Sequence, residues 1–199
     1  GERMAFRATI RDGTSSRKGI VRADATGNGS IIAERDTPTP SGSTYRNFLQ
    51  PAINSTGDVA WFAYLGDGRR GVFRTLLADP SLDRVGVIEG SPAPIAAYQF
   101  SDFDAPELSE SGAVVFWARA VDTMSTNVAE GVFVCEGGDG DCVTGSGTAW
   151  VLARDGDVVG GRELCEFGRT VHVSDYGATF LATTRTDCSN PSGSLEGAF

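Results

Sequence analysis

The segment INSTGDVAWFAYLGDGRRGVFRTL, residues Ile53 to Leu76, decides the fold because it reads as two strands joined by a turn. Its apolar residues alternate with other types, which is typical of a β-strand, and its Gly-Asp-Gly is a turn signal. Two later segments, LSESGAVVFWARA (Leu108–Ala120) and VSDYGATFLATT (Val173–Thr184), follow a similar pattern. The sequence therefore predicts a repeated β unit.

The spacing of two landmarks supports this repeat. The first landmark is an aromatic residue followed two positions later by alanine, and it occurs at Phe6, Trp61, Phe116 and Phe180, in steps of 55, 55 and 64 residues. The second landmark is a phenylalanine that ends a later strand, at Phe48, Phe103 and Phe167, in steps of 55 and 64 residues. Residues two apart on a strand share a face, so each aromatic residue and its alanine should point the same way.

Each unit also contains a strand that starts with glycine, and it is followed by a third apolar strand in the complete units. The glycine-led strands are GIV (Gly19–Val21), GVF (Gly71–Phe73), GVF (Gly131–Phe133) and GAF (Gly197–Phe199). Four short strands in each period of this length are typical of a β-propeller blade, and such a unit must stack on neighbours to bury both faces.

We therefore predict an all-β chain with a β-propeller-like array of four-stranded antiparallel sheets, in about three and a half repeats. Residues 1–199 form a single domain in this interpretation, with repeats at approximately 1–48, 49–104, 105–168 and a partial one at 169–199. The incomplete last repeat leads us to expect either a fragment of a larger propeller or a homo-oligomer or filament that borrows strands through the last blade.

A turn signature lies between the units: Asn or Ser, two residues, then Gly. It occurs at Asn54–Gly57, Ser109–Gly112 and Ser174–Gly177. Asn and Ser side chains hydrogen-bond to nearby backbone in turns, and glycine tolerates a positive φ, so these six residues are predicted to shape turns.

The stretch INSTGDVAWFA, which continues into GVF, resembles the N-x-x-G-x-x-x-A-F repeat of a family of secreted bacterial tandem-repeat proteins. The match is good at Asn54, Gly57 and Gly71–Phe73, whereas Ser109 and Ser174 replace Asn, and Trp61 stands where Phe is usual. The resemblance implies a propeller-like, exported and often surface-attached protein. It brings no catalytic residues.

Composition narrows the function classes. The formal net charge is −9 and Lys18 is the sole lysine, so the clustered positive surface that nucleic acids require is missing. The sequence contains no run of about 18 apolar residues, so it predicts no membrane-spanning helix. The four cysteines do not have zinc-site spacing, and we expect disulfides Cys135–Cys142 and, by elimination, Cys165–Cys188, formed in an oxidising extracellular compartment.

Several residues invite a chemical interpretation. His172, Ser174 and Asp175 suggest a hydrolase triad, but His172 and Ser174 lie two apart on one strand, so we interpret His172 as a solvent-facing polar residue. Asp175, Gly177, Thr179 and Phe180 resemble part of the sialidase Asp box, which is a hairpin turn and would indicate fold only. We assign no catalytic residue.

Acidic loops offer two further candidates. The aspartate pairs Asp139/Asp141 and Asp155/Asp157 have the oxygen ligands that calcium prefers, and a structural Ca²⁺ is the one cofactor that the sequence suggests, although plain solvated turns fit these loops better. The carboxylates of Asp102, Asp104 and Glu107 could be paired for glycoside hydrolysis, or could form a polar rim.

These observations predict a secreted or surface-displayed, non-enzymatic repeat module for binding, adhesion or assembly, with a protein or glycan ligand. The first alternative is an extracellular glycan-active hydrolase or lyase with its site at the propeller axis. The second alternative is a structural protein that assembles by sharing strands.

Overall fold

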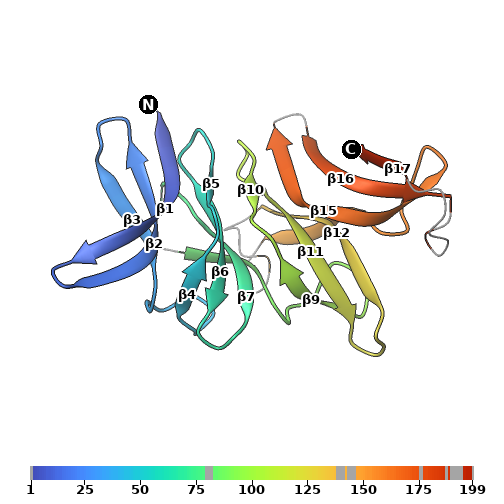
Figure 1. Cartoon of the computed structure of the whole chain (residues 1–199), viewed down its shortest axis with the longest axis horizontal. Coiled ribbons are helices and arrows are strands. Elements are labelled where there is room, and N and C mark those ends of the chain that lie inside the picture. The colour runs from blue at the N-terminus through green and yellow to red at the C-terminus, as the bar shows by residue number, and fades with distance from the viewer. Residues whose placement is uncertain are drawn as a thin grey trace.

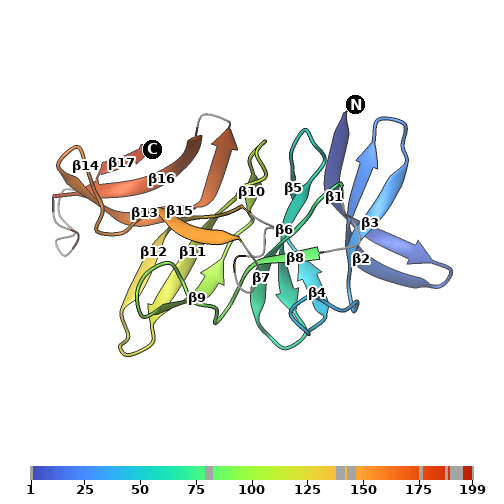
Figure 2. The ribbon, with the colours of Figure 1, turned by 180° about the vertical axis from the view of Figure 1, so that it is seen from behind.

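The structure is a computed structural model that describes residues 2–78, 83–137, 142, 147–174, 177–186, 188 and 195–198. Within these residues the chain is all-β, as predicted, with antiparallel sheets and no helix. Four sheets lie in a row, in chain order, from the N-terminal end of the molecule to the C-terminal end (Figure 1 and Figure 2). The described sheets form an open row, and a propeller-like closure stays a prediction.

The first half of the row consists of two sheets. Sheet 1 contains β1 (Arg3–Asp12), β2 (Ser15–Asp24) and β3 (Gly29–Glu34). Sheet 2 has the order β4-β6-β7-β8, with β5 also paired to β6; its strands are β4 (Tyr45–Phe48), β5 (Ala52–Ile53), β6 (Val59–Leu65), β7 (Arg70–Thr75) and β8 (Asp83–Ile88).

The second half of the row also consists of two sheets, and sheet 3 has the plan of sheet 2. Sheet 3 has the order β10-β11-β12-β13, with β9 also paired to β11; its strands are β9 (Tyr98–Phe103), β10 (Glu107–Leu108), β11 (Val114–Asp122), β12 (Val128–Glu136) and β13 (Thr148–Arg154). Sheet 4 contains, in order, β14 (Val158–Val159), β15 (Arg162–Ser174), β16 (Gly177–Arg185) and β17 (Leu195–Ala198).

Strand pairing shows that the four sheets are equivalent. The alanine of the aromatic-alanine landmark lies opposite the glycine that starts the next strand in every sheet: Ala8 opposite Gly19, Ala63 opposite Gly71, Ala118 opposite Gly131 and Ala182 opposite Gly197. The landmark phenylalanine lies opposite the same alanine from the other side: Phe48 opposite Ala63, Phe103 opposite Ala118 and Phe167 opposite Ala182. The repeat in the sequence is therefore a repeat in register.

This register shifts the sheet boundaries by one strand relative to the repeats predicted from sequence. The strand that ends each predicted repeat, with Phe48, Phe103 or Phe167, pairs forward with the first strand of the next repeat. As a result, the last sheet holds four strands rather than the two expected, while sheet 1 has no strand on the far side of β1 among the described residues. The sequence analysis read strand order along the chain, and forward pairing cannot be seen from order alone.

Three apolar clusters join successive sheets, and sheets 2 and 3 each contribute one face to the cluster before them and the other face to the cluster after them. In β6, Trp61 and Ala63 pack toward sheet 1, whereas Ala60 and Phe62 pack toward sheet 3. In β11, Phe116 packs toward sheet 2 and Trp117 toward sheet 4, and both are fully buried. This two-sided burial explains why VAWFAYL and VVFWARA are nearly continuous apolar runs rather than strictly alternating ones.

The landmark glycines are required by a close approach of the neighbouring strand. A bulge interrupts the pairing of the second and third strands at the same place in sheets 1, 2 and 3, and there a backbone carbonyl comes near the glycine. A Cβ atom built on Gly131 would lie 2.3 Å from the carbonyl oxygen of Ala153, and one on Gly19 would lie 2.7 Å from that of Ala33. Neither position has room for a side chain.

The predicted turns of sheets 2 and 3 lie side by side and are hydrogen-bonded to each other. Gly57 and Gly112 have φ of +91° and +87°, which glycine adopts without strain. The side chain of Asn54 accepts the Asp58 N–H at 2.9 Å within its own turn and donates to the Ser109 carbonyl of the next turn at 3.2 Å. We call this arrangement the turn ladder.

Two buried arginines strengthen the same edge of the row. Arg22 on β2 donates to the Gly57 carbonyl at 2.9 Å, and the equivalent Arg74 on β7 donates to the Gly112 carbonyl. Both side chains reach from one sheet to the turn of the next sheet. A charge-assisted hydrogen bond of this kind fixes the stacking of one sheet on the next.

Replacing Gly131 by alanine should destabilise the protein because the new methyl group would collide with the Ala153 carbonyl. We expect Gly131→Ala to lower the free energy of unfolding by about 1–3 kcal/mol, which is the usual cost of overpacking. Denaturant unfolding followed by fluorescence measures the change.

Gly29→Ala is the matched control, since its added Cβ would meet its nearest atoms at an ordinary 3.6 Å. It should change the free energy of unfolding by less than about 1 kcal/mol. Equal effects of the two substitutions would contradict the role assigned to the bulge.

Candidate functional site

Of the residues that sequence analysis marked for chemistry, Asp175 lies outside the described residues, and the described ones form no single group, although Glu107 and His172 come close. Asp104 accepts the N–H of Ala105 at 2.7 Å, and Ser174 donates to the Gly177 carbonyl at 3.3 Å. Glu107 and His172 face each other with 3.9 Å between a carboxylate oxygen and Nδ1, beyond hydrogen-bond distance. Burial raises the pKa of Glu107, and the nearby His172 opposes that rise. These groups serve separate local contacts rather than one reaction centre.

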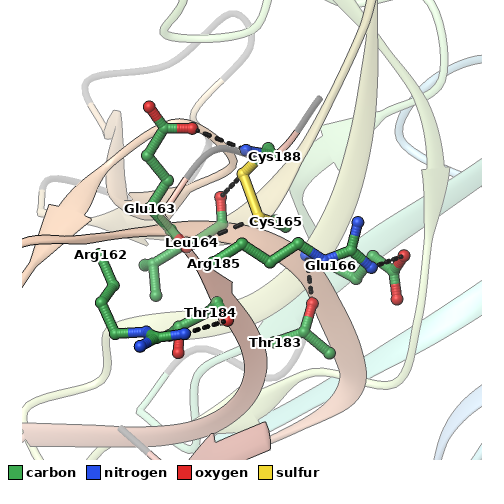
Figure 3. The surroundings of a disulfide bond; sticks show 9 residues. All are labelled: Arg162, Glu163, Leu164, Cys165, Glu166, Thr183, Thr184, Arg185 and Cys188. Carbon is green, nitrogen blue, oxygen red and sulfur yellow. Dashed lines mark hydrogen bonds and ion pairs between the residues drawn. A yellow bond between two sulfur atoms is a disulfide. The ribbon is translucent and has the colours of Figure 1, made fainter. Parts of the chain in front are cut away.

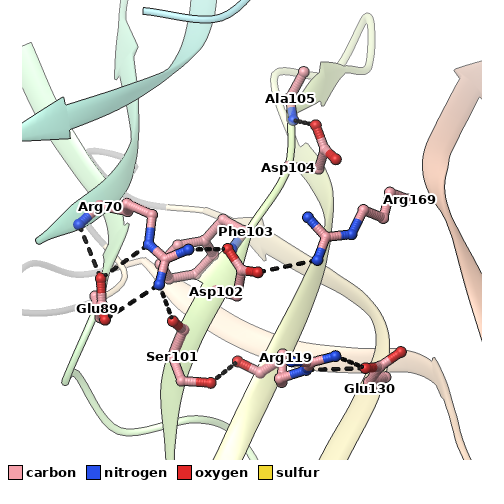
Figure 4. Close-up of polar contacts among 10 residues, drawn as sticks. All are labelled: Arg70, Glu89, Ser101, Asp102, Phe103, Asp104, Ala105, Arg119, Glu130 and Arg169. Carbon is pink, nitrogen blue, oxygen red and sulfur yellow. Dashed lines mark hydrogen bonds and ion pairs between the residues drawn. The ribbon is translucent and has the colours of Figure 1, made fainter. Parts of the chain in front are cut away.

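Asp102 is the centre of a charged cluster that links three sheets (Figure 4). Arg70 of sheet 2 and Arg169 of sheet 4 both donate to the Asp102 carboxylate of sheet 3, the latter at 3.1 Å. Arg70 also pairs with Glu89 at 3.1 Å, and the guanidinium of Arg169 lies 4.5 Å from the ring centre of Trp117. The Asp102 cluster, made of Arg70, Glu89, Asp102 and Arg169, is therefore an inter-sheet clamp.

The calcium candidates have different outcomes. Asp139 and Asp141 lie outside the described residues. Asp155 accepts the Glu130 N–H at 3.2 Å, and Asp157 accepts the Arg154 N–H at 2.9 Å, so both carboxylates support the backbone of a turn. In the described part of the chain, no group of three or more His, Cys, Asp or Glu side chains is placed to hold a metal ion.

The cysteines pair as the sequence suggested. Cys135 and Cys142 lie at disulfide distance with 6.0 Å between Cα atoms, and Cys165 and Cys188 do so with 5.3 Å. The second bond ties β15 to the segment that follows β16, and Glu163 accepts the Cys188 N–H beside it at 3.0 Å (Figure 3). Two such pairs fit an oxidising, extracellular environment.

An apolar groove lies between β13 of sheet 3 and the start of sheet 4. Its hollow measures about 640 Å³, and Leu152, Val158 and Val159, with 38%, 65% and 46% of their surface exposed, are its most accessible apolar positions. The full lining is Leu152, Ala153, Asp157, Val158, Val159, Leu164, Gly177, Ala178 and Phe180. We call it the β13 groove.

The groove exists because sheet 4 covers sheet 3 less completely than sheet 3 covers sheet 2. Val87 on β8 is buried under Phe133 and Val151 of sheet 3. The corresponding strand of sheet 3 is β13, but the described part of sheet 4 contains no strand beyond β17 to lie over it. Trp150, on this strand, is accordingly 36% exposed.

Sequence analysis missed this site. It predicted a third apolar strand in each complete unit but did not predict which side of that strand is covered. The usable signal was the presence of two large apolar side chains, Trp150 and Leu152, in a segment already expected to be a strand.

Comparisons with protein-family models, with curated proteins and with solved structures gave no match. The described residues contain no helix with the length and apolar character needed to cross a membrane.

Removing the central carboxylate of the Asp102 cluster should weaken the stack. Asp102→Ala leaves two arginines without their shared partner, and we expect the free energy of unfolding to fall by about 1–3 kcal/mol, the range for charged hydrogen bonds. Glu166→Ala is the control at the equivalent position before Phe167, since the Glu166 side chain is 68% exposed and contacts Arg185 at 3.4 Å. Its effect should stay below about 1 kcal/mol. A larger loss for Glu166→Ala than for Asp102→Ala would refute the assignment.

The stability of the protein should depend on pH through Asp155. Burial raises the pKa of Asp155, and the nearby Glu130 adds to the rise, although hydrogen bonds and Arg154 oppose it. The folded state therefore keeps a proton that an unfolded aspartate, with pKa about 4, has already lost. The contribution of protonated Asp155 to the free energy of unfolding is fully present below about pH 4 and is lost as pH rises through the raised pKa.

Asp155→Asn should remove this loss of stability at rising pH, because asparagine carries no titrating group and keeps an oxygen that can accept the Glu130 N–H. The variant should match the wild type near pH 3 to 4 and be the more stable protein at pH 7. Urea unfolding across this range tests the expectation. Asp157→Asn, which removes a carboxylate partner of Arg154, should show no such gain at pH 7. Parallel curves for wild type and Asp155→Asn would contradict the prediction.

Proposed function

We propose that this chain is a secreted or surface-displayed, non-enzymatic repeat module that works by binding a protein or glycan ligand. We further propose that its four stacked sheets belong to a propeller-like array. The observation that carries the binding proposal is the β13 groove, an exposed apolar hollow of about 640 Å³ lined by Leu152 of β13, the strand that also carries the partly exposed Trp150. Concave apolar sites with aromatic neighbours are typical ligand sites.

The polar groups of the chain support a binding role over catalysis. Of the carboxylates that looked catalytic, Asp102 pairs with two arginines, Asp104 accepts a backbone N–H and Glu107 faces His172. The two cysteine pairs support an extracellular location. The resemblance of the turn segment around Asn54 to exported repeat proteins points the same way.

A glycan-active hydrolase or lyase at a propeller axis is the runner-up. It would need carboxylates that converge on one hollow. A polar hollow of about 610 Å³, lined by Glu2, Arg3, Ile53, Asn54, Ser55 and Glu110, is the nearest approach. There Glu110 accepts the Ser55 N–H at 2.9 Å and so supports the turn ladder.

A ligand screen tests the binding proposal. The full chain is applied to arrays of extracellular glycans and of unfolded or extended peptides, and every ligand that binds is re-measured with a Trp150→Ala/Leu152→Ser double variant. We expect binding to weaken at least about tenfold, as for loss of an aromatic anchor at an interface. Both positions are partly exposed, so the fold should tolerate the change.

Met124→Ala is the control, because Met124 is 89% exposed and lies in the turn between β11 and β12. It should leave binding unchanged. Product release from any glycan by the wild-type chain would overturn the non-enzymatic proposal, and equal binding by the double variant would remove the groove as the site.

A further inference from the structure

Two rows of side chains make the contacts between successive sheets. The backward-facing row is Phe6, Trp61, Phe116 and Phe180, one from each sheet, and the last three pack against the sheet before. The forward-facing row is Arg7, Phe62, Trp117 and Leu181, each one position further along, and the first three reach the sheet after. Each interface in the chain joins one member of each row.

The backward-facing row is open at the N-terminal end. The side of sheet 1 that points away from sheet 2 carries the ion pair of Arg17 and Glu34 at one end, and we define the head face as its apolar part: Met4, Phe6, Ala8, Ile10, Val21 and Ile31. Met4 and Ile31 are 55% and 53% exposed, whereas the equivalent faces of sheets 2 and 3 are buried around Trp61 and Phe116. The head face thus has the apolar pattern of a stacking surface and no sheet over it in the described chain.

The forward-facing row is open at the other end. We define the tail face as the side of sheet 4 that points away from sheet 3: Glu166, Gly168, His172, Thr179, Leu181, Thr183 and Arg185. Leu181 is 57% exposed, whereas its equivalents Phe62 and Trp117 are each 1% exposed. A shallow hollow of about 260 Å³ lies beside Leu181 and Gly168.

We propose that the head face of one molecule stacks on the tail face of a second copy, so that copies associate head to tail. The two faces are the two halves of the interface that the chain already forms between its own sheets, and the proposed contact continues that interface. The hollow beside Leu181 would receive Phe6, as the forward faces of sheets 1, 2 and 3 receive Trp61, Phe116 and Phe180.

The interface between sheets 1 and 2 shows that a partly polar forward face is sufficient. Sheet 1 presents Arg7, Thr9 and Arg22 to sheet 2, and Arg7 and Arg22 donate to the carbonyls of Phe48 and Gly57. The polar and charged side chains around Leu181 are therefore no obstacle to stacking. A contact between two different faces does not close on itself in a dimer, so it extends into a filament or ring.

This inference does not depend on what the β13 groove binds. The groove lies between sheets 3 and 4, whereas the head and tail faces lie at the two ends of the row. The groove variant Trp150→Ala/Leu152→Ser should associate as the wild type does, so failure of either proposal can be told from failure of the other.

The test uses two blocked forms of the whole chain. Met4→Lys/Ile31→Lys places two charges on the head face, and Leu181→Arg places one on the tail face; all three positions are more than half exposed, so folding should survive. Sedimentation equilibrium should show a weight-average mass of wild type that rises with concentration above the 20.9 kDa monomer. Each blocked form alone should stay monomeric.

The decisive measurement is the equimolar mixture of the two blocked forms. The first keeps a free tail face and the second a free head face, so the mixture should form a dimer and nothing larger. Met124→Lys, a charge placed away from both faces, should associate as the wild type does. A monomeric wild type, unchanged association of Leu181→Arg, a monomeric mixture, or loss of association in the groove variant would each overturn the proposal.

Discussion

Burial of both faces of each sheet by its neighbours is the constraint on which this structure depends. A single sheet of four short strands leaves half of its apolar surface in water, and only stacking removes it. Sheet 2 meets this constraint, since Phe62 and Trp61 lie on opposite faces of β6 and both are buried. The charged contacts of the Asp102 cluster and the turn ladder then fix how the sheets are oriented on one another.

A short combination of residues maintains the repeated register. Phenylalanine, alanine and glycine lie across three adjacent strands, as in Phe103, Ala118 and Gly131. The glycine admits the bulged carbonyl of the third strand and the small alanine leaves room for the rings on either side, so Phe103 and Phe116 meet at 5.9 Å between ring centres. Large and small side chains alternate in this way wherever stacked layers interdigitate.

The sequence was sufficient to predict the all-β class and the equivalent positions, because burial on two faces leaves a spaced pattern around Trp61 and Phe116. It was not sufficient to predict which strand pairs forward, since pairing of Phe48 with Ala63 depends on register rather than on order. For the β13 groove the sequence offered only its large apolar side chains as a signal, because exposure of Leu152 depends on what sheet 4 fails to cover. Clusters such as that of Arg70 with Asp102 join residues that lie far apart in the chain, and no pattern in the sequence marks that they meet.

The three interfaces between sheets differ in how much apolar surface they bury, and the sheets should therefore open in a defined order. Sheet 1 contributes Ile20 and Ala33 as its buried apolar residues to the first interface, whereas sheet 3 contributes larger side chains such as Trp117 to the last one. Regions with few buried apolar contacts open at lower free-energy cost than the rest of a fold. Sheet 1 should consequently detach first, so the backbone amides of its central hairpin would exchange with solvent deuterium sooner than those of β6 and β11.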